Sequence, residues 1–72
     1  MAEEIRAEIV ATVRDVLVHE GESVEEGDTL VLLESVEIEV PVVAAVSGPV
    51  TRLAVRAGDT VGEGDLIAVV AD

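Results

Sequence analysis

The residues with the clearest chemical potential are three glutamates within one short segment, Glu34, Glu37 and Glu39. Clustered carboxylates are the ligands that hard divalent cations prefer. In an extended chain, Glu37 and Glu39 point to the same face, and no loop of further oxygen ligands surrounds them. We therefore expect solvated carboxylates here and no metal site.

The single histidine, His19, is the one side chain of a type that ordinarily exchanges protons near neutral pH. It stands directly before Glu20 and Gly21, without a serine or an acid in a context typical of a catalytic triad. Cysteine is absent, which removes disulfides, thiol catalysis and cysteine metal sites together. The chain has no candidate catalytic residue, and we expect a protein that is not an enzyme.

The charge balance excludes several classes of partner. All four basic residues are arginines, and 16 acidic residues bring the formal net charge to −12. Binding to nucleic acid or to an anionic membrane depends on Lys and Arg, so we expect neither. Apolar runs such as residues 40–46 are too short to cross a bilayer, and no signal peptide pattern is present, which predicts a cytoplasmic protein.

Strands, not helices, must position these residues. The 72 residues include 16 valines, which favour pleated surfaces, and no segment keeps an apolar helical period. Turn signals such as Gly27-Asp28 and Gly64-Asp65 separate short runs with period two. Pro41 and Pro49 fit strand ends or edges. The pattern predicts an all-β flattened barrel or sandwich of about seven or eight strands in two antiparallel sheets, one domain over residues 1–72.

The core must be aliphatic, because the chain has no Phe, Tyr or Trp and only one Met. The apolar runs at residues 30–33 and 67–70 are its best candidates. We expect Leu32 to lie in the core, so that Leu32→Ala would cost about 2–5 kcal/mol.

The sequence contains an internal repeat. Residues 21–28 match residues 58–65 at an offset of 37. Two halves of this size predict a pseudo-twofold arrangement of the two sheets, since a solenoid needs more repeats. The segment at residues 34–41 has no counterpart in the second half. We expect it to form a hairpin between the halves, with its tip near Val36 and Glu37.

This layout resembles the biotinyl/lipoyl carrier domain family, and within it the small stand-alone biotinylated proteins of actinobacteria. That family has two Gly-Asp turns, and between them an apolar strand, Glu-Ser/Ala-Met-Lys-Met-Glu, a Pro-Val strand and Gly-x-Val. The matching residues here are Gly27-Asp28, residues 30–33, residues 34–39, Pro41-Val42, Gly48-Pro49-Val50 and Gly64-Asp65. The resemblance covers essentially the whole chain and implies the carrier fold.

The residue that would carry the cofactor is missing. In the family, the hairpin lysine takes biotin through an amide, and the matching position here is Glu37, flanked by Val36 and Ile38 instead of methionines. Acyl transfer to a side chain needs an amine nucleophile, which a carboxylate is not and a protonated guanidinium does not supply. Because the chain contains no lysine, we expect no biotin or lipoyl group on any side chain and no cofactor.

Two origins fit such a chain. A family backbone that was redesigned or mutated to erase the site is favoured by the joint loss of Lys, aromatic and internal Met residues, and a natural degenerate copy is the other. By resemblance, the partners would be a biotin ligase and the subunits of a biotin-dependent carboxylase, and we expect a monomeric, non-enzymatic scaffold. The alternative function is an interaction module, similar to the lysine-free lipoyl-like domains of transport adaptor proteins, which would self-associate.

Overall fold

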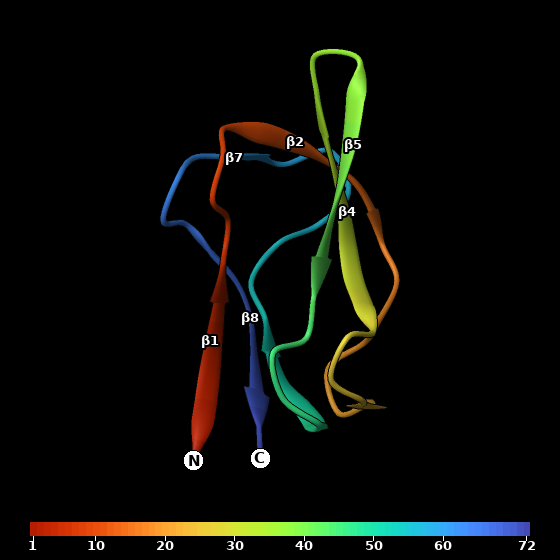
Figure 1. The fold of residues 1–72 in the computed structure, drawn as a ribbon, viewed down its shortest axis with the longest axis vertical. Helices are drawn as coiled ribbons and strands as arrows, with labels where there is room; N and C mark the ends of the chain where they lie inside the picture. The colour runs from red at the N-terminus through yellow and green to blue at the C-terminus, as the bar shows by residue number, and fades with distance from the viewer.

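The computed structural model describes all residues 1–72, and every regular element in it is a strand (Figure 1). The strands are β1 (Ala2–Arg6), β2 (Ala11–Val16), β3 (Ser23–Val24), β4 (Thr29–Ser35), β5 (Ile38–Val43), β6 (Gly48–Leu53), β7 (Thr60–Val61) and β8 (Leu66–Ala71). They form two four-stranded antiparallel sheets, in the orders β1-β8-β6-β3 and β5-β4-β2-β7. The all-β, two-sheet prediction is confirmed. None of the segments forms a helix of the length and apolarity needed to span a membrane.

The core between the sheets is entirely aliphatic, and no polar or charged residue is buried. Its largest fully buried side chains are Leu30, Leu33, Ile67, Val13, Val31, Val50 and Val70. The expectation for Leu32 is wrong, because this residue is only half-buried. A register shift in β4 between Thr29 and Val31 interrupts the alternation. Leu30 and Val31 are therefore both buried, while Leu32 faces away from the core.

The hydrogen bonds and strand register repeat at the offset of 37 residues. The pairs Ile5↔Ala68 and Glu4↔Val69 between β1 and β8 recur as Val42↔Val31 and Pro41↔Leu32 between β5 and β4. The same offset relates the backbone bonds Gly21 N→Val50 O and Gly58 N→Val13 O, at 2.7 Å each. The two halves therefore adopt the same structure, as the sequence repeat predicts.

This symmetry makes the β8–β1 pair the counterpart of the β4–β5 hairpin. The chain ends consequently lie where a second hairpin tip would be, and Figure 1 shows them side by side at the far end of the molecule from the tip. The Met1 amine lies 2.8 Å from a carboxylate oxygen of Asp72. The hydrogen bond and the positive charge of this amine lower the pKa of the Asp72 carboxyl.

Candidate functional site

The β4–β5 hairpin protrudes beyond the rest of the molecule (Figure 1). Its closing pair is Ser35↔Ile38, so the turn consists of Val36 and Glu37. Glu37 is the only non-glycine residue with a positive φ, at 67°. A positive φ at the second of two turn residues is typical of a type II turn and costs a non-glycine residue about 1–2 kcal/mol. The predicted tip is thus confirmed, and Glu37 stands at its apex in a strained backbone conformation.

The apex is exposed and apolar on both sides of the carboxylate. Val36 is 89% exposed and Ile38 is 57% exposed, which are high values for aliphatic side chains. Glu37 is also exposed and takes part in no hydrogen bond or ion pair between protein groups. Its carboxylate is therefore free to contact a partner molecule.

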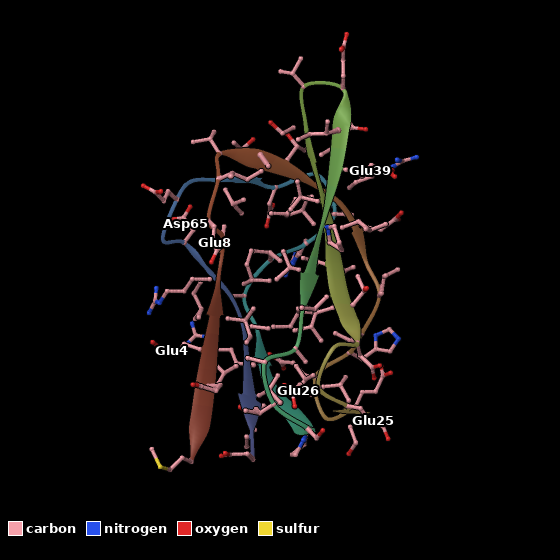
Figure 2. All side chains as sticks on the ribbon, in the orientation of Figure 1. Glu4, Glu8, Glu25, Glu26, Glu39 and Asp65 are labelled. Atoms are coloured by element: carbon pink, nitrogen blue, oxygen red, sulfur yellow. The ribbon has the colours of Figure 1, made fainter.

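The base of the hairpin carries an ion cluster of Arg14, Glu34 and Glu39. Glu34 on β4 and Glu39 on β5 are cross-strand partners. The guanidinium of Arg14 on β2 forms an ion pair with Glu39, and its Nη1 lies 4.0 Å from Glu34 Oε2. All three side chains are about half exposed, and Figure 2 shows Glu39 below the tip. The positive charge of Arg14 thus offsets part of the negative charge of Glu34 and Glu39.

The three glutamates singled out from the sequence are thus divided by the structure. Glu34 and Glu39 are brought together with Arg14, whereas Glu37 lies in the turn and forms no ion pair. Arg14 was not identified from the sequence, because its position depends on a register shift between Val13 and Asp15 in β2. No motif marks that bulge.

The remaining candidates for acid–base or metal chemistry are the acidic side chains and His19. No group of three or more His, Cys, Asp or Glu side chains is arranged to hold a metal ion. His19 lies in an exposed turn, where its backbone N–H donates to Glu22 Oε1 at 3.1 Å. The apex instead consists of one exposed carboxylate between two exposed aliphatic side chains, carried by the two-sheet fold.

The comparisons with known proteins agree with this geometry. A biotin/lipoyl family model described as "Biotin-requiring enzyme" matches residues 3–70. A biotinylated protein TB7.3 homologue from Mycobacterium leprae is 54% identical over 70 residues, which is 97% of this chain and 99% of the relative. The alpha3 subunit of a biotin-dependent acyl-coenzyme A carboxylase from the same species is 41% identical over 64 residues, 89% of this chain and 11% of the subunit.

Solved structures contain the same fold. The crystal structure of Kluyveromyces lactis urea carboxylase matches with a TM-score of 0.91 and 32% identity, covering 99% of this chain and 6% of that protein. The chain thus corresponds to one small part of the large carboxylases, and to nearly the whole of the small mycobacterial relative. The family model and the 54% identical relative show that this chain belongs to the biotin/lipoyl domain family, and within it the chain resembles the stand-alone biotinylated proteins of actinobacteria.

Proposed function

We propose that this protein is a single carrier-type domain that presents the carrier hairpin but accepts no biotin or lipoyl group. The observation that carries the proposal is Glu37 at the hairpin apex in a chain without lysine. Attachment of either cofactor requires a side-chain amine that attacks an activated acyl group. Glu37 has no such nucleophile, and the four arginines are held protonated by their guanidinium chemistry.

The partners proposed are those that would recognise the hairpin and scaffold. The names of the relatives support a biotin ligase and the subunits of a biotin-dependent carboxylase as this set. The domain would then act as a non-enzymatic scaffold that engages these proteins without carrying a group between them. This holds equally for a redesigned chain and for a natural degenerate copy, since both lack the amine. That the protein is monomeric and that it is located in the cytoplasm both stay predictions.

The exposed apolar apex favours one alternative, a lysine-free interaction module of the transport-adaptor type. Val36 and Ile38 together present aliphatic surface that a neighbouring copy could cover. This alternative predicts self-association, whereas a net charge of −12 opposes it. Sedimentation velocity at two concentrations separates the two: a ring or other stable oligomer supports the module, and a monomer supports the carrier-type domain.

The direct test restores the amine. Glu37→Lys is incubated with a biotin ligase, ATP and biotin, and the intact protein is weighed. We expect the gain of one biotinyl group on Lys at this position and none on the side chains of the unchanged protein. Glu26→Lys is the matched control, because it places a lysine in an exposed turn at the opposite end of the molecule (Figure 2).

The outcomes are distinct. Modification of Glu37→Lys but not of Glu26→Lys supports a hairpin that is still read as a carrier. Equal modification of both, or side-chain modification of the unchanged chain, contradicts the proposal. A folded Glu37→Lys that stays unmodified shows that ligase recognition is lost. The triple variant with Val36→Met and Ile38→Met then tests whether the flanking residues are the cause.

A further inference from the structure

A groove of about 460 Å³ opens where the two sheets part, between the edge strands β1 and β5. Both are edge strands of their sheets, and Figure 1 shows that they run in opposite directions. The groove walls are mainly aliphatic and include Ile5, Ile9, Leu33, Ile38, Val40 and Val42. Its volume lies within the range of small-ligand pockets, about 300–1,000 Å³.

The charged side chains of the groove are two carboxylates and one guanidinium. Arg6 is its only cation, and this guanidinium already donates to Glu4 Oε1 at 2.8 Å and to the Gly64 carbonyl at 2.9 Å. The Glu8 carboxylate has no partner within the protein, and Pro41 has no N–H to donate. Glu4 and Glu8 lie along β1 and the segment that follows it (Figure 2). A complementary ligand is therefore mainly aliphatic and supplies a positively charged donor to the Glu8 carboxylate.

Charge also selects among possible occupants. A second copy would bring another net charge of −12 against the same face, which opposes its approach. A ligand that only added a further strand to either sheet edge would be hindered by the proline on β5 and the charged residues on β1. Both features commonly protect sheet edges. A segment whose aliphatic side chains enter the groove while a cation reaches the Glu8 carboxylate meets neither obstacle.

We propose that the groove between β1 and β5 docks a short peptide segment of a partner protein, with aliphatic side chains flanked by Arg or Lys. The segment buries its aliphatic side chains against Ile9, Val40 and Val42, and a flanking cation pairs with the carboxylate of Glu8, while Glu4 stays paired with Arg6. The groove shares Ile38 with the hairpin apex but does not include Glu37.

The test uses the full chain labelled with nitrogen-15 and the capped peptide acetyl-Arg-Leu-Val-Leu-Arg-amide. At about 0.01 M salt, where the screening length is about 30 Å, we expect amide shift changes at Ile9, Val40, Val42 and Ala45. The turn at Gly58 and Asp59 forms its backbone hydrogen bonds with Val13 and Arg56, outside the groove, so it serves as an internal reference and should stay unchanged. The peptides Glu-Leu-Val-Leu-Glu and Arg-Ser-Thr-Ser-Arg, capped alike, separate the charge requirement from the apolar one, and both should bind more weakly.

Two variants locate the site. Ala45→Leu places a larger side chain on the groove wall and should weaken binding about tenfold or more, because it takes up the volume of the ligand. Ala57→Leu is the matched control, an exposed alanine outside the groove, and should leave binding unchanged. Glu8→Gln should weaken binding about two- to fivefold, the range expected of one exposed ion pair.

Several outcomes overturn the proposal. The first two are the absence of amide shift changes and shift changes spread equally over the acidic turns. The third is binding of the serine or glutamate peptide as strong as that of the Arg-Leu-Val-Leu-Arg peptide. The fourth is an equal effect of Ala45→Leu and Ala57→Leu on binding. Groove shifts that depend on protein concentration without peptide would assign the face to a second copy. Because the unchanged chain is used, failure here leaves the ligase test of Glu37→Lys unaffected.

Discussion

Glu34 and Glu39 lie directly opposite each other on β4 and β5, and their counterparts in the second half of the fold are Ala71 and Ala2. Like charges at paired positions destabilise an antiparallel sheet. Arg14, which contacts both glutamates, corresponds by the same offset to Thr51. The charged cluster therefore exists only in the half that carries the hairpin, and we infer that Arg14 offsets the repulsion at the base of that hairpin.

Removing this arginine should destabilise the domain. We expect Arg14→Gln to lower the free energy of unfolding by about 0.5–1 kcal/mol, since the ion pairs are half exposed. Adding Glu34→Gln should recover most of the loss, because the remaining carboxylate no longer faces a like charge. Urea titrations of the single and double variants measure both changes. A double variant less stable than Arg14→Gln alone would show that repulsion is not the cause.

The paired Gly-Asp turns give a second prediction. Asp28 Oδ2 accepts a hydrogen bond from the Glu25 N–H at 2.9 Å, and Asp65 Oδ2 accepts one from the Gly62 N–H at 2.7 Å. Each carboxylate satisfies a turn N–H, as side chains do at helix caps. We expect Asp28→Ala and Asp65→Ala to cost about 1 kcal/mol each. The exposed Glu63, which accepts no such bond, provides the control Glu63→Ala, and equal losses for all three in thermal unfolding would refute the role of these bonds.

The fold could be predicted because its signals are local and duplicated. The repeat at offset 37 marks two equivalent halves, and the unmatched segment between them contains the hairpin with Glu37 at its tip. Arg14 and Leu32 could not be placed in the same way. Both lie at or beside register shifts that break the alternation of strand faces, and a bulge depends on pairing with a distant strand.

The groove between β1 and β5 could not be predicted from the sequence either. The groove exists because the two sheets separate at their edges, which no local pattern encodes. From the sequence, residues such as Ile9 and Val42 are indistinguishable from other apolar residues of strands or loops. The absence of lysine, by contrast, is read directly from the sequence, and the proposal that the apex accepts no acyl group rests on it.

Gly48, the first residue of β6, should tolerate substitution less well than the turn glycines. Its φ is 152°, and a Cβ at this position would collide with the backbone carbonyl of Ala71, lying 2.8 Å from the carbonyl carbon. We expect Gly48→Ala to cost about 2–3 kcal/mol, because backbone atoms of β8 must move. Gly21→Ala is the matched control: its φ is 90° but nothing lies within 4 Å, so only backbone strain of about 1–2 kcal/mol remains. Equal losses in urea titrations would disprove the clash.

Alanine substitutions of the two neighbouring leucines on β4 should lower the free energy of unfolding by very different amounts. Leu33 is 1% exposed and packs in the core, so Leu33→Ala should cost about 2–5 kcal/mol. Leu32 is half-buried on the outer face, and Leu32→Ala should cost less than about 2 kcal/mol because a cavity does not form there. Urea denaturation of both variants measures the difference, and a larger loss for Leu32→Ala would mean that the register of β4 differs from the one described.

The acidic excess should make stability depend on salt. A net charge of −12 on 72 residues produces self-repulsion in the compact state, and dispersed carboxylates on exposed strands contribute most of it. Raising NaCl from about 0.01 M to about 0.5 M shortens the screening length from about 30 Å to a few ångströms. We therefore expect the melting temperature to rise by several degrees, measured by circular dichroism. Sodium sulfate is not a suitable substitute, because it also strengthens apolar burial. A melting temperature that stays constant or falls in NaCl would show that local ion pairs, such as that of Arg14 with Glu39, outweigh the global repulsion.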